Sequence, residues 1–330
     1  MSNKQYKVVV VGGGSWGTAI VSLVAKKINV IWWIRRESQI NQINKKGRNT
    51  RYLPNCKLNT SNIQLTNEKK MIFSADLIIV ATPSEFLDNI FSSEAKSLDN
   101  KIIVSAVKGV IPQINQTPQQ YFKKLNPTIS YGVISGPCHA EEVALLKKSY
   151  LTFSSPNNSV VNYLSEIFKS DYINVKLSSD VIGTELAAIL KNVYALATGI
   201  CSGLGYGDNF LAVLITASTN ELKRVLFALD PKERVISQSA YLGDLLVTCY
   251  SLHSRNRRFG NYIGKGYSVE STKSVMNMVA EGYNATACVY QLLSEQNMLD
   301  NIPIINSTYN ILYNEHEPEK EMEILSNIIS

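Results

Sequence analysis

The stretch that decides the fold is Val8-Val9-Val10-Val11-Gly12-Gly13-Gly14-Ser15-Trp16-Gly17, close to the start of the 330-residue chain. The valines predict a buried strand, and residues 18–27 continue as a helix. Between them the glycines have the spacing G-x-G-x-x-G, in which Gly12 makes the turn, Gly14 lets backbone amides approach a pyrophosphate, and Gly17 permits close packing of helix on strand. The stretch therefore predicts a dinucleotide-binding loop, with the phosphates at the positive end of the helix.

The second predicted strand bears on which dinucleotide binds. It ends in Arg35-Arg36, about twenty residues beyond the loop, where an acidic residue would otherwise bond the ribose 2′-hydroxyl. Arginine at this place suits a 2′-phosphate, which favours NADP(H) and leaves NAD(H) possible. The alternative is a pair of solvated arginines, and Glu37 follows them directly.

Apolar runs continue through the first half of the chain. Near-continuous apolar strands separated by helical stretches indicate a parallel sheet covered on both faces. From about Ser178 the pattern changes to long helices, with Val181–Gly199, Phe210–Phe227 and Ser274–Leu292 as candidates. The other predicted strands are Val30–Ile34, Leu77–Ala81, Ile102–Ala106, Ile129–Ile134, Tyr150–Phe153 and Ile173–Val175.

We therefore expect an α/β chain of two domains. A Rossmann-like, mostly parallel-sheet domain spans residues 1–178, and an all-helical substrate and catalytic domain spans residues 179–330. No glycine- or serine-rich linker separates them. A tight junction of this kind predicts that the site lies in a cleft between the domains.

Composition narrows the class of protein. The 33 basic and 27 acidic residues are spread along the chain without a basic cluster, so we expect small anionic ligands and no nucleic acid. The three histidines and the widely spaced cysteines, without a CxxC, predict no metal site and a reducing, cytoplasmic compartment. His139 and His253 have no nucleophile to pair with, so we expect them to be peripheral. The cysteines are Cys56, Cys138, Cys201, Cys249 and Cys288.

The uncharged run Val8–Ala25 resembles an export signal or a short membrane span. Its middle contradicts both, because the glycines between Gly12 and Gly17 would break a spanning helix. We expect no stable membrane insertion.

Two lysines are candidates for chemistry. Lys108 follows an apolar strand, so we expect it at the carboxyl edge of the sheet, where open α/β folds bind ligands. Lys191 is the only charge between Glu185 and Asp208. It either snorkels at the edge of its helix or faces a site. If it faces a site, burial and a second cation such as Lys108 would lower the pKa of its ammonium and help it exchange a proton.

Two further groups of polar residues are candidates for binding. Asp244 and Thr248 lie four apart, on one face if the segment is helical, and can orient Lys191 or hold a substrate hydroxyl. Ser254-Arg255-Asn256 follows a turn and offers hydroxyl, guanidinium and amide donors to a phosphate. The alternatives are ordinary capping for the first pair and a basic surface loop for the second.

Together these segments resemble the bacterial NAD(P)-dependent glycerol-3-phosphate dehydrogenases over almost the whole chain. Seven blocks match in order. They are Gly12–Ala19, Ala106–Gly109, Ser135–Val143, Leu190–Ile200, Leu242–Ser251, Ser254–Gly260 and Val279–Ala285.

The resemblance implies an enzyme that moves a hydride between NAD(P)H and dihydroxyacetone phosphate, giving sn-glycerol 3-phosphate for phospholipid synthesis. It implies Lys191 as the proton donor to the ketone oxygen, and a homodimer. The substrate-contacting positions it implies are Lys108, Gly136, Cys138, Lys191, Asp244, Ser254, Arg255 and Asn256. The cofactor-contacting positions are Gly12, Gly14, Ser15, Trp16, Gly17, Arg35, Arg36, Lys108, Ala140, Arg255, Val279 and Glu281.

Two positions depart from the family pattern. Cys138 stands where the family usually has serine or threonine, and a thiol is the poorer hydrogen-bond donor. Tyr241 replaces a small residue. The alternative functions are another dehydrogenase of the same architecture with a lysine acid, acting on a hydroxyacid or sugar acid, and a dinucleotide sensor without turnover.

Overall fold

The computed structural model describes residues 6–276 and 280–329. The chain forms two units: unit 1 comprises Met1–Val107 and Pro118–Val181, and unit 2 comprises Lys108–Thr117 and Ile182–Ser330. The predicted boundary between residues 178 and 179 assigns the segment 108–117 to the first domain. The contacts of this segment place it in unit 2 instead. The reason is hydrophobic, because the buried Val110 of this segment packs in the core of unit 2.

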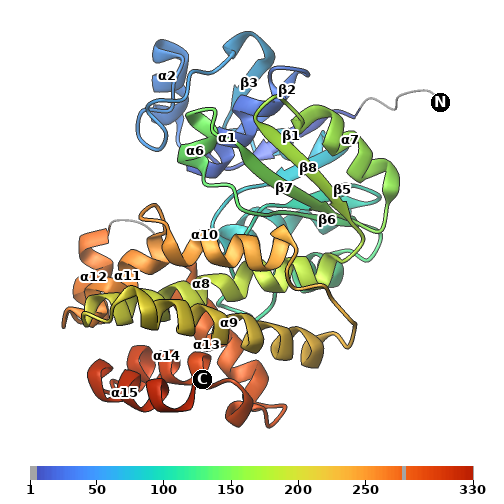
Figure 1. Cartoon of the computed structure of the whole chain (residues 1–330). Coiled ribbons are helices and arrows are strands. Elements are labelled where there is room, and N and C mark those ends of the chain that lie inside the picture. The colour runs from blue at the N-terminus through green and yellow to red at the C-terminus, as the bar shows by residue number, and fades with distance from the viewer. Residues whose placement is uncertain (1–5, 277–279, 330) are drawn as a thin grey trace. The chain divides into compact units, whose positions relative to one another are not determined.

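Unit 1 is built on one sheet of eight strands in the order β3-β2-β1-β4-β5-β6-β7-β8 (Figure 1). The first six strands have the order of a doubly wound dinucleotide-binding sheet. Only the β6–β7 pairing is antiparallel, so the prediction of a Rossmann-like, mostly parallel sheet is confirmed. The strands are β1 (Val8–Val11), β2 (Val30–Trp33), β3 (Ile63–Thr66), β4 (Leu77–Val80), β5 (Ile102–Ser105), β6 (Ser130–Ser135), β7 (Ser149–Ser154) and β8 (Ile173–Ser178).

Both faces of this sheet are covered, which is why its central strands are apolar throughout. Val8 and Val10 of β1 share a core with residues of α1, α6 and α7. Elsewhere in the unit, Phe91 of α4 and Phe122 of α5 meet edge to face with ring centroids 5.0 Å apart. The helices of unit 1 are α1 (Ser15–Val24), α2 (Glu37–Lys46), α3 (Lys70–Phe73), α4 (Leu87–Phe91), α5 (Pro118–Leu125), α6 (Ala140–Ala144) and α7 (Asn158–Phe168), with 3₁₀ turns η1 (Thr60–Asn62), η2 (Ser84–Phe86) and η3 (Ser92–Leu98).

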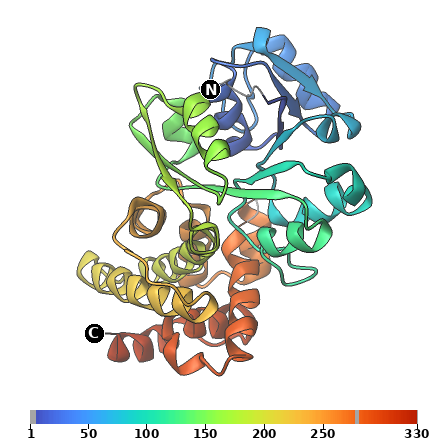
Figure 2. The ribbon, with the colours of Figure 1, turned by 90° about the vertical axis from the view of Figure 1, so that its right-hand side faces the viewer.

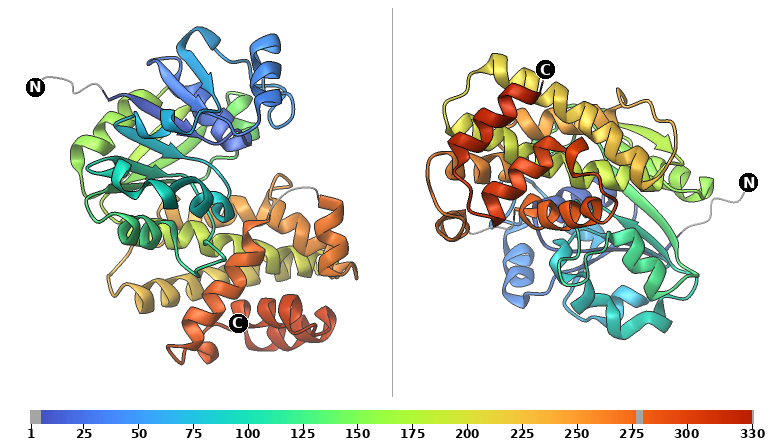
Figure 3. Two further views of the ribbon diagram at one scale, coloured as in Figure 1. Left: turned by 180° about the vertical axis from the view of Figure 1, so that it is seen from behind. Right: turned by 90° about the horizontal axis from the view of Figure 1, so that it is seen from below.

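In unit 2 the described residues from 182 onward form helices joined by turns, as predicted, whereas the segment 108–117 has no helix and contains an isolated β-bridge between Ile111 and Gln116. Figures 2 and 3 show the helices from the side, from behind and from below. Helices α13, α14 and α15 pack against one another in chain order. The elements are α8 (Val181–Gly203), α9 (Asp208–Leu229), a π turn η4 (Ser239–Gly243), α10 (Asp244–Tyr250), α11 (Arg255–Gly264), α12 (Val269–Met276), α13 (Glu281–Ser294), a 3₁₀ turn η5 (Leu299–Asn301), α14 (Pro303–Tyr313) and α15 (Pro318–Ile328).

The predicted single helix Ser274–Leu292 is wrong. Helix α12 ends at Met276, residues 277–279 lie outside the described part, and α13 begins only at Glu281 after an extended Ala280. The start of α13 is fixed from another helix, because the side-chain oxygen of Asn256 accepts a 2.9 Å hydrogen bond from the Gly282 amide. A long-range contact therefore overrides the local helical pattern.

Helix α8 is the core of unit 2. It is long and apolar enough to cross a membrane, but 89% of its apolar 18-residue stretch is buried inside the protein. The lysine of this helix, Lys191, is thus carried into the interior by its apolar neighbours.

A buried carboxyl joins α9 to α14. Glu221 accepts hydrogen bonds from the amides of Ile304 (2.9 Å) and Ile305 (3.0 Å), at the start of α14. These amides belong to a helix end that has no side-chain cap of its own. Burial outweighs both amides and raises the pKa of Glu221 to about 8.

Candidate active site

The glycine loop after β1 has the geometry that its spacing predicts. Gly12 has φ +127°, and a Cβ there would lie 2.5 Å from the Ala81 carbonyl oxygen. A Cβ on Gly17 would lie 2.2 Å from the Gly12 carbonyl oxygen, so α1 and the loop touch through backbone. A Cβ on Gly14 would have no neighbour within 4 Å in the described part of the chain. Gly14 therefore leaves an open approach to the loop, as a pyrophosphate requires.

Side chains hold this loop from behind through its carbonyl oxygens. Trp32 Nε1 donates to the Gly12 oxygen at 2.8 Å. Gln39 and Asn49 both donate to the Gly13 oxygen, at 2.6 and 2.9 Å, and Asn49 also donates to Thr18 Oγ1 at 2.7 Å. Three side chains thus fix the Gly12 and Gly13 carbonyls of the loop through hydrogen bonds. The sequence pattern does not single out Gln39 or Asn49, since neither belongs to a recognisable motif.

The start of α1 fits a phosphate group. Helix α1 begins at Ser15, and its N-cap Gly14 provides no side-chain cap. Ser15 Oγ donates to the Tyr52 carbonyl oxygen at 3.1 Å. Trp16 Nε1 is buried and has no hydrogen-bond partner among the described residues, which is costly unless a ligand or water accepts from it. An open glycine, an uncapped helix end and an unsatisfied indole are together consistent with a dinucleotide pyrophosphate.

Arg35 and Arg36 follow β2 and are both exposed. The Arg35 guanidinium lies 4.9 Å from the centroid of the Phe86 ring, and Arg36 is the N-cap of α2. Stacking on Phe86 restricts a side chain that would otherwise be fully solvated. The two cations thus stand at the end of the second strand, as the sequence predicts.

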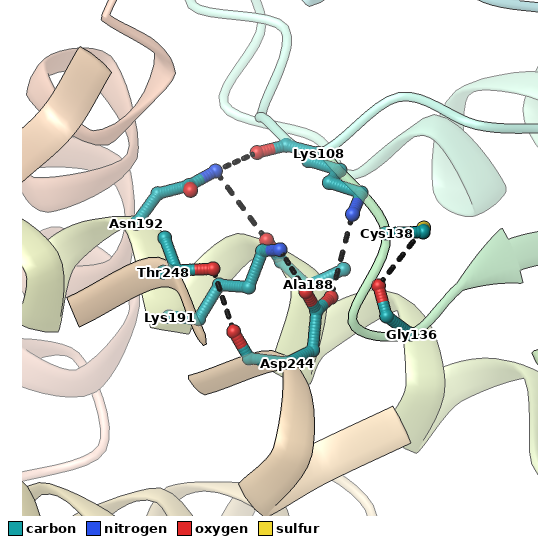
Figure 4. A network of polar contacts seen from close by, with 8 residues as sticks. All are labelled: Lys108, Gly136, Cys138, Ala188, Lys191, Asn192, Asp244 and Thr248. Carbon is teal, nitrogen blue, oxygen red and sulfur yellow. Dashed lines mark hydrogen bonds and ion pairs between the residues drawn. The ribbon is translucent and has the colours of Figure 1, made fainter. Parts of the chain in front are cut away.

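The loop after β6 contains two further predicted contacts. Gly136 has φ +109°, and a Cβ there would lie 2.5 Å from the Tyr150 carbonyl oxygen. The buried Cys138 thiol donates to the Gly136 carbonyl oxygen at 3.0 Å, so the cysteine closes its own turn (Figure 4). Ala140 is the first residue of α6. All these cofactor-loop features belong to unit 1.

Unit 2 brings Lys191, Asp244 and Lys108 together (Figure 4). Lys191 Nζ of α8 donates to Asp244 Oδ1, and Lys108 Nζ lies 3.4 Å from Asp244 Oδ2. Lys191 is only 5% exposed and Asp244 1%, whereas the Lys108 side chain is one-fifth exposed. The buried carboxylate of Asp244 therefore contacts two ammonium groups.

This arrangement changes the proton affinity of its members. Burial is the largest influence on the pKa of Lys191 and lowers it, the attraction of Asp244 raises it, and the charge of Lys108 lowers it; together they bring the pKa to about 8. The predicted direction of the shift is confirmed. For Asp244, burial alone would raise the pKa, but the two lysines outweigh burial and lower it. At neutral pH the cluster thus carries a carboxylate, an ammonium and a lysine poised to exchange its proton.

Two neighbours hold this cluster in place. Asn192 Nδ2 donates to the Lys108 carbonyl oxygen at 2.6 Å, which ties the segment 108–117 to α8. Thr248 Oγ1 donates to the Asp244 carbonyl oxygen at 2.6 Å, within α10. The hydroxyl of Thr248 therefore supports the backbone of Asp244 rather than Lys191. Asn192 was not predicted, although it is the polar residue beside Lys191 in an apolar helix.

Ser254-Arg255-Asn256 forms the start of α11. Ser254 is the N-cap, and its Oγ accepts from the Arg257 amide at 3.2 Å. Arg255 and Asn256 occupy the first turn, which adds a guanidinium to the positive end of a ten-residue helix. Asn256 is tied to Gly282, next to Glu281 at the start of α13. The predicted Val279 lies outside the described residues.

Comparison with known proteins assigns the family. Residues 7–161 match the model of the NAD-dependent glycerol-3-phosphate dehydrogenase N-terminus, and residues 180–323 match the model of its C-terminus. The chain belongs to the NAD-dependent glycerol-3-phosphate dehydrogenase family. The resemblance inferred from the sequence blocks is therefore confirmed.

Individual members of the family agree over nearly the full length. The chain is 36% identical to the glycerol-3-phosphate dehydrogenase [NAD(P)+] of Bacillus subtilis, covering 97% of this chain and 93% of that protein. It is 33% identical to the enzyme of the same name from Staphylococcus carnosus, covering 97% of each. The crystal structure of the glycerol-3-phosphate dehydrogenase from Coxiella burnetii superposes with a TM-score of 0.89 at 28% identity, covering 97% of this chain and 98% of that one.

Proposed function

We propose that this member of the family catalyses reversible hydride transfer between NAD(P)H and dihydroxyacetone phosphate, giving sn-glycerol 3-phosphate. The observation that carries the proposal is the buried Lys191, bonded to Asp244 beside Lys108, with its pKa lowered to about 8. A ketone reduction needs one proton donor of this kind, because the alkoxide that forms must be protonated at a pH near 7.

In this proposal Lys191 Nζ holds the proton and delivers it to the oxygen of the reacting carbonyl. Asp244 orients the ammonium, and the charge of Lys108 stabilises the negative charge that develops on the same oxygen. In the reverse direction the neutral Lys191 accepts the proton of the alcohol. The two directions therefore use opposite protonation states of one side chain.

The phosphate of the substrate would bind at the start of α11. Arg255 supplies charge-assisted hydrogen bonds, and the helix end supplies a positive field. Ser254 and Asn256 fix the geometry of this turn through the Arg257 and Gly282 amides. Gly136 and Cys138 remain proposed substrate contacts of unit 1, and for Cys138 the backbone is the available donor, since its thiol is used within the turn.

The proposed cofactor contacts are the glycine loop, Ser15, Trp16, Arg35, Arg36 and Ala140 in unit 1, with Lys108, Arg255, Val279 and Glu281 in unit 2. When bound, the reduced nicotinamide supplies the hydride. Arg35 and Arg36 support a preference for NADP(H). Replacing either one with serine should lower the ratio of NADPH to NADH efficiency by about 10- to 100-fold, since it removes a charge-assisted bond.

We further propose that the enzyme is a cytoplasmic homodimer whose product serves phospholipid synthesis. Family membership supports these points.

The test is the oxidation of NADPH and of NADH, followed by absorbance, with purified protein and dihydroxyacetone phosphate. A Lys191→Ala variant should lose nearly all turnover, and Lys223→Ala, an exposed lysine of α9, is the matched control. Full activity of Lys191→Ala would refute the role of the lysine. An inactive wild type that remains folded and binds NADPH would refute the substrate.

A further inference from the structure

An exposed pair of leucines ends α6 in unit 1. Leu145 and Leu146 are 54% and 60% exposed. Leu146 has φ 56°, the left-handed region that glycine favours and leucine rarely adopts. A large apolar side chain is thus kept outside the core at a position where glycine would relax the backbone. Such an outlier points to a use for the side chain itself.

Lysines follow this pair in the chain, and hydrogen bonds link their neighbourhood to further lysines. Lys147 and Lys148 follow it directly, and Lys148 Nζ donates to the Asp171 carbonyl oxygen at 2.5 Å. Beside Asp171, Lys26 Nζ donates to the Tyr172 hydroxyl at 2.9 Å. Contacts between the ends of α1 and α7 bring in two more lysines, since Lys27 Nζ donates to the carbonyl oxygen of Lys169 at 2.6 Å. We call Lys26, Lys27, Lys147, Lys148 and Lys169 the basic rim; α6 and α7 are labelled in Figure 1.

The charge of the basic rim is not neutralised by ion pairs among the described residues. The oxygens that its ammonium groups contact belong to backbone carbonyls and to one phenol, which carry no charge. The exposed acidic side chains beside it are Glu166 and Asp171, while Glu141 and Glu142 are half-buried in the first turn of α6. Among the residues named here, five exposed cations therefore stand against two exposed anions in number.

We propose that Leu145, Leu146 and the basic rim dock unit 1 on the surface of an anionic lipid bilayer. The leucines would enter the boundary between headgroups and acyl chains, and the lysines would meet the lipid phosphates. Reversible attachment to a membrane needs two weak signals of this kind, an apolar insertion and a basic patch. A protein partner fits less well, because two leucines on one turn fall far short of the apolar core of a stable interface.

Sedimentation with vesicles tests the proposal on the full chain. Wild type should bind vesicles of phosphatidylcholine with 30% phosphatidylglycerol at low salt, fail to bind pure phosphatidylcholine, and be released by 0.5 M salt. The double variant Leu145→Gln/Leu146→Gly should bind the anionic vesicles at least about tenfold more weakly than wild type, since two apolar side chains no longer insert. Lys147→Gln/Lys148→Gln should also weaken binding about tenfold.

The controls separate docking from folding. Leu146→Gly relaxes a strained backbone, so the leucine variant should melt no lower than wild type and keep its rate with dihydroxyacetone phosphate in solution. Leu252→Gln in unit 2, which removes a more exposed leucine, and Lys123→Gln/Lys124→Gln on α5 should bind vesicles like wild type. Absence of wild-type binding to anionic vesicles would overturn the proposal, as would unchanged binding of the leucine variant. Self-association that the leucine variant abolishes, without vesicle binding, would instead assign the patch to a second copy.

Discussion

Replacing Asp244 with asparagine tests the central electrostatic argument. The variant keeps the shape of the side chain but removes the negative charge that contacts both Lys191 and Lys108. The attraction of Asp244 raises the pKa of Lys191 against burial and against Lys108. Without it, the two remaining influences act together, and the pKa of Lys191 must fall below about 8.

The size of the effect follows from Coulomb's law. Two unit charges about 4 Å apart interact by roughly 4 kcal/mol at an effective dielectric constant of 20, which sets an upper bound of about 3 pH units. Water entry and relaxation reduce this, so we expect a fall of at least about 1 unit. At pH 7.5 the protonated fraction of Lys191 would then drop about threefold, and the loss of orientation should lower the rate further.

The assay is the pH dependence of kcat/KM for dihydroxyacetone phosphate reduction between pH 5.5 and 9.5. In wild type the rate should decline as pH rises through about 8, and in Asp244→Asn the same decline should occur at least one unit lower. Asp300→Asn, an exposed position in unit 2, is the control and should leave the profile in place. A decline that stays near pH 8 in Asp244→Asn, or moves upward, would show that Lys191 is not the group observed.

Lys108→Gln should shift the pH profile in the direction opposite to Asp244→Asn, because it removes a cation that lowers the pKa of Lys191. The fall in the rate of dihydroxyacetone phosphate reduction should then occur above pH 8, and an unchanged pH profile would contradict an influence of Lys108 on Lys191. Gly14→Ala should keep the wild-type melting temperature, since its Cβ meets no described protein atom, yet weaken NADPH binding at least about tenfold, because the Cβ occupies the open approach to the loop. Gly17→Ala should lose both stability and NADPH binding, because its Cβ would lie 2.2 Å from the Gly12 carbonyl oxygen. Equal melting temperatures for these two variants would refute the assigned geometry. Glu221 holds a proton in the folded state up to about pH 8 but releases it near 4.5 when unfolded, so its contribution to stability is present at low pH and lost as pH rises through about 8. Urea unfolding at pH 5 and pH 8.5 should show this loss, by at most ~3–5 kcal/mol, in wild type and not in Glu221→Gln.

Much of unit 1 could be predicted from local pattern because its strands are short, apolar and punctuated by glycine or charge. Strand β3, which the sequence analysis did not predict, shows where local pattern is insufficient. Its sequence Ile63-Gln64-Leu65-Thr66 is only half-buried at the edge of the sheet, so it lacks the continuous apolar run of the central strands. Its position is determined by pairing with β2, and that information is not local.

The site shows the same division between local and distant information. Lys191 could be found because a single charge in an apolar helix is conspicuous, and Asp244 because it begins a helical segment with Thr248. That Asp244 would accept from Lys191 and Lys108 at once could not be predicted, since these residues lie 53 and 136 positions away. The support of Gly13 by Asn49 escapes prediction for the same reason, being a contact over 36 positions.

The energetics of the lysine cluster favour a catalytic rather than a structural origin. Two lysines around one buried aspartate leave a net positive charge in the interior, and taking charges out of water costs several kcal/mol per ion. A structural role would be served as well by an apolar cluster of the same volume, often with greater stability. The excess charge becomes favourable only when negative charge develops beside it, as on the oxygen of a ketone that accepts a hydride. The cluster is therefore expected to destabilise the free enzyme, and Lys191→Met, which removes one buried charge and leaves Asp244 paired with Lys108, should raise the melting temperature while abolishing turnover. A Lys191→Met variant that is both inactive and less stable would indicate that the lysine mainly holds the fold together.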